Sequence, residues 1–331
     1  MSVRLVEVTR SGIVESIHNG DIVVVNSKGD IQYLVGDPHR LTFFRSTAKP
    51  IIAVAVLQGG VAEKFNLDLK EVAIIASSHS GGKEHIEVLK SIMRKTGTDI
   101  SMLKCGIREP TGKEEARELA NEGLKPDELH CNCSGKHLGV IALAKEKGLA
   151  QEDYHKIEHT VQRIIEQVVA DFCGVSTESM TIGVDGCGVP VYGIPLINMA
   201  LAYANLCDES FMKGKYRKSQ KYVIDSMTTY PEMVAGKGRL DTALMKQYGD
   251  RIIGKFGAEG VYCAGLIGKG IGVALKIEDG NSRAVPPVVV ETLVRIKALT
   301  YDEAERLKEF WRPDVTNNRG EKVGEMKAVW I

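Results

Sequence analysis

Residues 45–50 read Arg-Ser-Thr-Ala-Lys-Pro and lead directly into the apolar run 51–57, Ile-Ile-Ala-Val-Ala-Val-Leu. That run has no polar face, so a helix formed there would be buried in the middle of the fold. Pro50 is compatible with a helix only near its start, because the first four backbone N–H groups have no partner within the helix. The stretch therefore predicts a buried central helix that begins close to Ser46.

Ser46 and Lys49 are three residues apart, which places both side chains on one helical face. At a helix start, the dipole and the free backbone N–H groups favour developing negative charge. A serine beside an amine there is a candidate activated nucleophile. The alternative is that Ser46 only caps the helix and Lys49 extends its ammonium into water.

A lysine base needs a lowered pKa. A free lysine with a pKa near ~10.4 is neutral only about once in 2,500 at pH 7, and lowering that pKa to about 7 takes roughly 4.6 kcal/mol. Burial and a second nearby cation could together supply this difference. A second lysine is therefore expected in the site.

The chain has 331 residues with 43 basic and 43 acidic side chains, so its formal charge is zero. Because the chain has no net charge that would attract nucleic acid or an anionic membrane, a small neutral or zwitterionic substrate fits better than a polymer. Residues 1–7 lack the apolar core of a signal peptide, and no apolar stretch approaches the ~20 residues that span a bilayer. With seven cysteines, we expect a cytoplasmic protein with reduced thiols, some of which could bind metal.

The predicted fold class is α/β of the α+β type: a mainly antiparallel sheet built from both chain ends, with flanking helices. Short β-rich runs at 3–9, 13–17, 22–26 and 31–35, separated by turn signals, predict an antiparallel meander, and further strands are expected at 261–264, 273–277 and 328–331. Helical spacing is found at 84–95, 113–122, 137–148, 152–173, 193–206, 219–228, 286–298 and 301–309. Residues 1–331 are expected to form a single catalytic domain, with a helical portion at roughly 84–250 beside the sheet.

Three polar loops are candidates for the site. Residues 77–82 read Ser-Ser-His-Ser-Gly-Gly, residues 130–137 read His-Cys-Asn-Cys-Ser-Gly-Lys-His, and residues 183–190 read Gly-Val-Asp-Gly-Cys-Gly-Val-Pro. Hydroxyls, an imidazole, thiols and a lone acid next to glycines suit the wall of a pocket better than an ordinary connection.

Three motifs occur in a fixed order: Ser-Thr-Ala-Lys at 46–49, Ser-His-Ser at 78–80 and Lys-Phe-Gly at 255–257. This is the motif order of serine β-lactamases and penicillin-binding proteins. Together with residues 15–18, 131–137, 185–188 and 257–260, the motifs make the chain resemble the Rhizobium-type (class 3) L-asparaginases of the L-asparaginase II family over nearly its whole length. The resemblance implies a β-lactamase-like sandwich and hydrolysis of L-asparagine. Ser80 and Phe256 depart from the wider β-lactamase motifs, which argues against penicillin recognition.

The resemblance implies two serine–lysine couples, Ser46 with Lys49 and Ser78 with Lys255. Physical chemistry supports the pairing, because two nearby lysines lower each other's pKa by like-charge repulsion. Which serine is acylated stays open, with Ser46 as the first choice and Lys49 as its base.

The resemblance also implies a metal site at Cys133, Lys136 and Cys187. Two thiolates suit Zn²⁺, but a lysine ligand must first lose its proton, and His130 or His137 would be a more ordinary ligand. The alternative is that both cysteines are buried thiols without a metal.

Four further side chains are expected to contact the substrate: Arg45, His79, Ser80 and Asp185. Arg45 could pair with a substrate carboxylate and Asp185 with the substrate ammonium. Equally, Arg45 could be a structural ion-pair partner, Asp185 could hydrogen-bond the backbone of its own turn, and His79 could be an ordinary loop histidine.

The sequence therefore predicts an L-asparagine amidohydrolase that gives L-aspartate and ammonia through a serine acyl-enzyme, with the oxyanion held by backbone N–H groups at the start of the Ser46 helix. A glutaminase and a β-lactamase-like hydrolase are the alternatives among enzymes. Outside enzymes, the alternative is a zinc- and thiol-dependent amino-acid binding protein. A homodimer is expected as the commonest assembly.

Overall fold

A computed structural model describes residues 2–330 of the chain. The strands are β1 (Val3–Arg10), β2 (Ile13–Asn26), β3 (Ile31–Val35), β4 (Leu41–Phe43), β5 (Thr181–Val184), β6 (Pro190–Pro195), β7 (Ile252–Gly257), β8 (Val261–Leu266), β9 (Ile271–Ile277), β10 (Asp314–Thr316) and β11 (Lys322–Ala328). The α-helices are α1 (Lys49–Gln58), α2 (Val61–Phe65), α3 (Leu69–Ile75), α4 (Lys83–Thr96), α5 (Lys113–Asn121), α6 (Ser134–Glu146), α7 (Thr160–Cys173), α8 (Leu196–Leu206), α9 (Arg217–Thr229), α10 (Pro231–Val234), α11 (Leu240–Tyr248), α12 (Val285–Arg295), α13 (Tyr301–Glu305) and α14 (Lys308–Trp311). Single-turn 3-10 helices are η1 (Arg45–Ala48), η2 (Ile100–Met102), η3 (Glu128–His130), η4 (Thr177–Ser179), η5 (Phe211–Gly214) and η6 (Ser282–Ala284).

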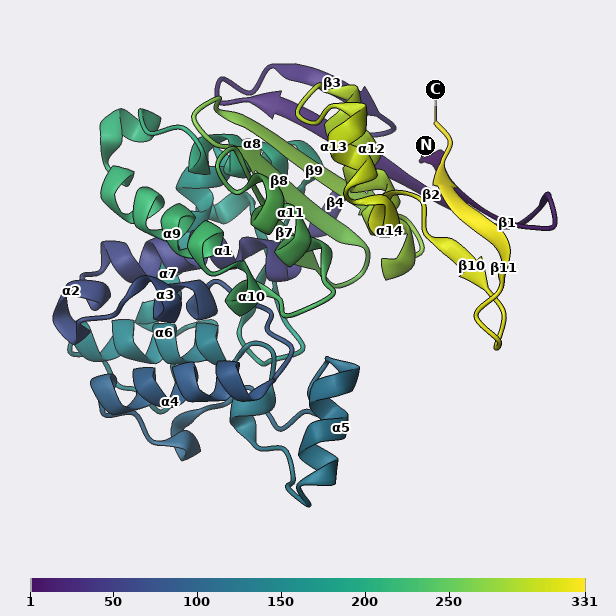
Figure 1. Cartoon of the computed structure of the whole chain (residues 1–331). Coiled ribbons are helices and arrows are strands. Elements are labelled where there is room, and N and C mark those ends of the chain that lie inside the picture. The colour runs from purple at the N-terminus through teal and green to yellow at the C-terminus, as the bar shows by residue number, and fades with distance from the viewer. Residues whose placement is uncertain (1, 331) are drawn as a thin grey trace.

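The larger sheet is antiparallel throughout, in the order β10-β11-β1-β2-β9-β8-β7, and β3 pairs with β2. Strand β1 lies beside β11, with Val6 opposite Ala328, so the two chain ends meet in one sheet (Figure 1). This confirms the predicted α+β class and the antiparallel sheet from both ends. A second antiparallel sheet, β4-β6-β5, was not expected from the sequence.

Alternating side chains of β2 divide the apolar core into two clusters. Val23 and Val25 pack with the helical part of the molecule, whereas Ile22 and Val24 pack with α12 on the opposite face of the sheet. Successive side chains of a strand point to opposite faces, so one apolar strand contributes to both clusters. Figure 1 shows α8 and α12 on opposite faces of this sheet.

The expected turn at residues 19–21 is wrong, because β2 runs without a break from Ile13 to Asn26. Gly20 lies where β2 passes between β1 and β9, and a Cβ at this position would be 2.3 Å from the carbonyl oxygen of Lys276. Asp21 is buried, binds Arg40 and accepts a hydrogen bond from the backbone N–H of Asp37. The glycine and the acid therefore serve close packing and a buried ion pair rather than a turn.

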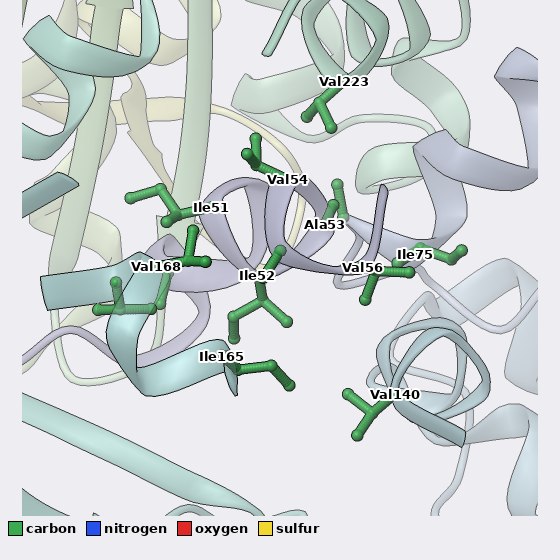
Figure 2. Close-up of a cluster of buried hydrophobic side chains, with 14 of the residues drawn as sticks. Ile51, Ile52, Ala53, Val54, Val56, Ile75, Val140, Ile165, Val168 and Val223 are labelled. Atoms are coloured by element: carbon green, nitrogen blue, oxygen red, sulfur yellow. The ribbon is translucent and has the colours of Figure 1, made fainter. Parts of the chain in front are cut away.

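Helix α1 lies at the centre of the helical part of the molecule, as the apolar run predicts. Every residue from Lys49 to Leu57 is buried. Figure 2 shows the helix surrounded by Val140 of α6, Ile165 of α7 and Val223 of α9. Its first residue, Lys49, is thereby fixed in the interior of the protein.

Ser46 does not cap this helix, so that part of the prediction is wrong. Ser46 lies in η1, and α1 begins at Lys49 with Ala48 as its N-cap residue. Arg45, the first residue of η1, has a φ of 51°, in the left-handed region that non-glycine residues rarely adopt. Ser46 therefore stands one turn ahead of the buried helix.

Most predicted helices are present, with three corrections. Helix α7 begins at Thr160 rather than near residue 152, because the His159 side chain accepts a hydrogen bond from the Val161 N–H and caps the helix there. The helix expected from residue 193 begins at Leu196, since residues 190–195 pair with β4 and β5. The helix expected at 301–309 is divided into α13 and α14.

The last strand of the chain begins and ends earlier than predicted. The strand expected at 328–331 lies earlier, as β11, and Ile331 is outside the described residues. None of the helices in residues 2–330 is long and apolar enough to cross a membrane.

Candidate active site

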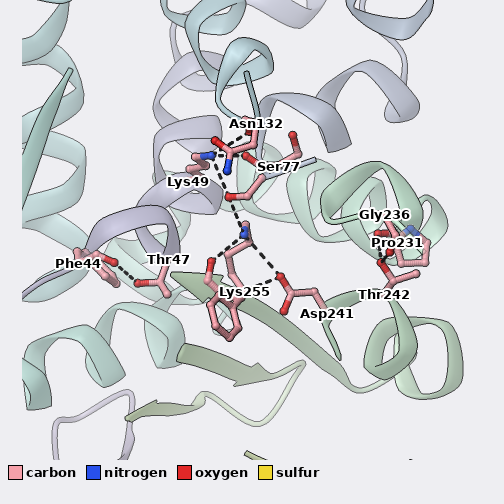
Figure 3. Close-up of polar contacts among 12 residues, drawn as sticks. Phe44, Thr47, Lys49, Ser77, Asn132, Pro231, Gly236, Asp241, Thr242 and Lys255 are labelled. Atoms are coloured by element: carbon pink, nitrogen blue, oxygen red, sulfur yellow. Dashed lines mark hydrogen bonds and ion pairs between the residues drawn. The ribbon is translucent and has the colours of Figure 1, made fainter. Parts of the chain in front are cut away.

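Two lysines from distant parts of the chain, Lys49 and Lys255, point toward each other (Figure 3), and both bind the hydroxyl of Ser78. The Nζ of Lys49, at the start of α1, donates to Ser78 Oγ at 2.9 Å, and the Nζ of Lys255, in β7, donates at 3.0 Å. Lys49 is 1% exposed and Lys255 is 0% exposed. The structure thus brings together three of the four predicted catalytic residues in one buried cluster.

Both amines also donate to backbone carbonyl oxygens. Lys49 Nζ also donates to the carbonyl oxygens of Ser77, at 2.6 Å, and Asn132, at 3.4 Å. Lys255 Nζ donates to the carbonyl oxygen of Phe256 at 2.9 Å. Because a buried ammonium without partners would be costly, these acceptors hold both side chains in one orientation.

The protonation of Lys255 is shifted toward the neutral amine. Burial and the positive charge of Lys49 lower the pKa of Lys255 to about 8, although Asp241 opposes the shift. At pH 7 roughly a tenth of such a group is neutral, far more than for a free lysine. Lys255 can therefore act as a proton acceptor near neutral pH.

Ser46 is half-buried in η1 and stands apart from this cluster. Its Oγ makes no hydrogen bond with any of residues 2–330, and Lys49 directs its amine toward Ser78 instead. The predicted Ser46–Lys49 contact is thus not formed, and the catalytic roles of both residues stay predictions.

Arg45 and Asp185 form an ion pair with each other. Arg45 Nε lies 2.9 Å from Asp185 Oδ1, and the two side chains are 24% and 11% exposed. The two side chains that were predicted to bind the substrate carboxylate and ammonium therefore lie side by side, and Arg45 directly precedes Ser46 in the chain. A partly exposed pair of opposite charges can exchange its partners for those of a zwitterion.

His79 and Ser80 face protein groups in this structure. His79 Nε2 lies 2.9 Å from Ser134 Oγ, and burial lowers the pKa of His79 well below its ordinary value. Ser80 Oγ donates to Glu115 Oε1 at 2.7 Å, which ties α5 to the loop that carries Ser78. Both residues are buried, so substrate contact by either stays a prediction.

Cys133, Lys136 and Cys187 lie together, as the resemblance implies. Lys136 Nζ is 3.1 Å from Cys187 Sγ, and all three side chains are buried. Interactions with the neighbouring thiols of Cys131 and Cys187 hold the pKa of Cys133 well below its ordinary value. Cys187 Sγ is also 3.9 Å from Asp185 Oδ2, so this thiol cluster adjoins the Arg45–Asp185 pair.

The chemistry of these donors decides how well they fit zinc. Two thiols, one already inclined to ionise, suit Zn²⁺. Burial acts to lower the pKa of Lys136, but the neighbouring Cys187 and Cys133 outweigh burial and raise that pKa. Lys136 is therefore a suitable zinc ligand only after a metal displaces its proton. Within residues 2–330, no group of three or more His, Cys, Asp or Glu side chains is arranged to hold a metal ion.

Two carboxylates near the lysine cluster, Glu115 and Asp241, were not predicted from the sequence. Asp241 is 1% exposed in the first turn of α11, with Oδ2 3.5 Å from Lys255 Nζ. Its segment was not predicted as a helix. The apolar spacing of Leu240, Leu244 and Tyr248 could have indicated one, with the acid placed at its start.

Comparisons with known proteins place this geometry in context. The model of the family described as L-asparaginase II matches residues 6–328. A search of the curated proteins found no match. Among solved structures, a β-lactamase from Mycobacterium bovis has a TM-score of 0.46 and 14% identity, covering 84% of this chain and 94% of that chain. A class C β-lactamase mutant has a TM-score of 0.43 and 14% identity, covering 88% and 92%. Mglu in its native form in the presence of 4.3 M NaCl has a TM-score of 0.39 and 14% identity, covering 85% of this chain and 61% of that chain.

The lowered pKa of Lys255 predicts a pH dependence of stability. With a folded pKa of about 8 against an ordinary 10.5, the unfolded chain binds this proton more tightly. The free energy of unfolding should therefore rise between pH 8 and 10.5, by up to about 3 kcal/mol. Urea unfolding at about pH 7.5 and pH 10 should show this rise in the wild type and its loss in Lys255→Met. Lys28→Met, at an exposed lysine, should keep it. If the free energy of unfolding rose equally in Lys255→Met, the pH dependence could not be assigned to Lys255.

Proposed function

The chain belongs to the L-asparaginase II family, and we propose that its two-lysine site hydrolyses the side-chain amide of L-asparagine to L-aspartate and ammonia through a serine acyl-enzyme. The observation that carries the proposal is the convergence of the buried amines of Lys49 and Lys255 on the hydroxyl of Ser78. Such a cluster supplies both a proton acceptor and a proton donor for acyl transfer.

Ser46 is the nucleophile in this proposal. Ser46 is half-buried and adjoins the Arg45–Asp185 pair, whereas the hydroxyl of Ser78 is held by two amines and is 8% exposed. A neutral Lys49 takes the Ser46 proton as Oγ attacks the amide carbonyl carbon. Ammonia leaves with that proton, and water then hydrolyses the ester.

Ser78 serves as a proton relay between the two lysines. Its Oγ is within hydrogen-bond distance of both amines, so it can accept a proton from one and donate to the other. The second candidate mechanism makes Ser78 the nucleophile and Lys255 its base. The 3.0 Å contact between these two side chains favours it.

The Arg45–Asp185 pair gives a recognition mode for an amino acid. Arg45 would bind the substrate α-carboxylate through its guanidinium, and Asp185 would bind the α-ammonium. The substrate then replaces one ion pair with two, which orients its side-chain amide toward Ser46. Backbone N–H groups at the start of η1 would hold the oxyanion, since the first N–H groups of a helical turn lack internal partners.

Zinc enters the proposal through the thiol cluster. Cys133, Lys136 and Cys187 would hold Zn²⁺, with Lys136 as a neutral amine. Bound there, the ion would supply a positive charge and a Lewis acid beside Asp185. The homodimer and the cytoplasmic location expected from the sequence are also proposals, and light scattering of the purified protein tests the first.

The choice of nucleophile gives the sharpest test of the mechanism. Acid quenching during turnover of L-asparagine, followed by peptide mass spectrometry, should find an aspartyl ester on the peptide that carries Ser46. Ser46→Ala should lose the ester and lower turnover by at least roughly a thousandfold, because the covalent route is lost.

Ser78→Ala is the matched variant. It should still form the ester on the Ser46 peptide, at a rate lower by about 10²-fold or more, since only proton transfer is impaired. An ester on the Ser78 peptide of the wild type would overturn the assignment in favour of the second mechanism.

The zinc proposal predicts one Zn²⁺ per chain after loading and dialysis, measured by elemental analysis. Cys187→Ser should weaken the affinity at least roughly tenfold, because it removes one of two thiolate ligands. Cys207→Ser changes a buried thiol outside the cluster and should bind zinc like the wild type. Equal zinc binding by both variants would show that the thiol cluster is not the metal site.

A further inference from the structure

Asp241 is a buried carboxylate whose position the mechanism above does not use. It lies in the first turn of α11, which packs on β7, the last strand of the larger sheet. Its Oδ2 is 3.5 Å from Lys255 Nζ, and its Oδ1 is buried without a hydrogen-bond partner in residues 2–330. A buried carboxylate in such surroundings needs a compensating positive charge.

Asp241 also fixes the backbone on which Lys255 stands. The N–H of Phe256, the next residue along β7, donates to Asp241 Oδ2 at 3.0 Å. Within residues 2–330, strand β7 pairs only with β8, and the N–H of Phe256, which binds Asp241, lies on the free edge of the sheet. The carbonyl oxygen of the same residue accepts from Lys255 Nζ. One carboxylate therefore holds both the amine and its strand, as Figure 3 shows.

The charges around the two lysines are not symmetrical. Lys49 has only neutral oxygens as partners among residues 2–330, whereas Lys255 has a carboxylate. The other charged or titratable groups that act on Lys255 are Lys49 from α1, Arg239 from the turn before α11 and Cys133 from the loop before α6. Asp241 is the nearest of the acidic groups, so it dominates the stabilisation of the Lys255 cation.

We propose that Asp241 is a positioning residue, which holds the Lys255 amine against Ser78 and stabilises the protonated form of that amine. The opposing influence of Asp241 on the pKa of Lys255 agrees with this geometry. The kinetic part of the inference rests on the proposed function, whereas the effect on Lys255 does not.

The test replaces the charge while keeping the shape. In Asp241→Asn, the titration of the Lys255 amine should move to lower pH by roughly 1 to 3 units, because a nearby opposite charge is lost. NMR of ¹⁵N-lysine-labelled protein follows this titration without any substrate, and Lys255→Met assigns the signal. The lower limb of the pH profile of kcat/KM for L-asparagine should move in the same direction, with KM changed less than about twofold.

Three further variants separate positioning from stability. Asp241→Glu keeps the charge and should leave the titration within about half a unit of the wild type. Asp241→Ser, made in parallel, provides a second neutral variant if Asp241→Asn does not fold. Glu71→Gln removes another buried carboxylate with a lysine partner, Lys95 at 2.6 Å, far along the chain from β7. Glu71→Gln should lower the thermal stability of the protein and leave the pH profile of kcat/KM unchanged.

An unchanged Lys255 titration in the folded neutral variants would overturn the proposal and reduce Asp241 to a structural acid at the start of α11. Absence of turnover by the wild type at every pH would defeat the proposed function instead. In that case the NMR titration would still decide the role of Asp241.

Discussion

The hydrogen bonds from Lys49 and Lys255 to one hydroxyl, that of Ser78, set the geometry of the whole site. Two amines buried this close cannot both carry a full charge at low cost, so each must be surrounded by well-placed oxygens. These oxygens come from the backbone at Ser77, Asn132 and Phe256. The loop after α3, the thiol-rich loop before α6 and the edge of the sheet are thereby held around one point.

The fold provides that arrangement through two buried elements. Helix α1 is enclosed on all sides and fixes Lys49, while β7 fixes Lys255 at the edge of the sheet. A Cβ on Gly257, at the end of β7, would be 3.0 Å from Cγ2 of Thr47 in η1. Glycine therefore permits the sheet to approach the Ser46 turn closely. The site lies where the helical part of the molecule meets the sheet.

The features that follow from local sequence could be predicted. The apolar run 51–57 could only be buried, and the order of the motifs indicated that Ser78 and Lys255 belong to one site, where the two side chains do meet, whereas the place of Ser46 in that site stays a prediction. Tertiary contacts decided the rest. Gly20 is required by a close strand crossing rather than a turn, and β4 pairs with β6 across some 150 residues of chain, which no local pattern indicates. Asp241 reaches the site only through the packing of α11 on β7. That residues 1–331 form a single catalytic domain stays a prediction.

The most direct test of the account is ammonia release by the purified protein, with L-asparagine, L-glutamine and a chromogenic β-lactam assayed side by side, with and without added Zn²⁺. Lys49→Met and Lys255→Met serve as variants in the same assay. We expect ammonia release from L-asparagine, little release from L-glutamine, no β-lactam hydrolysis, and loss of activity in both variants. The absence of ammonia release from either amide under any metal condition would contradict the amidohydrolase and favour an amino-acid binding protein.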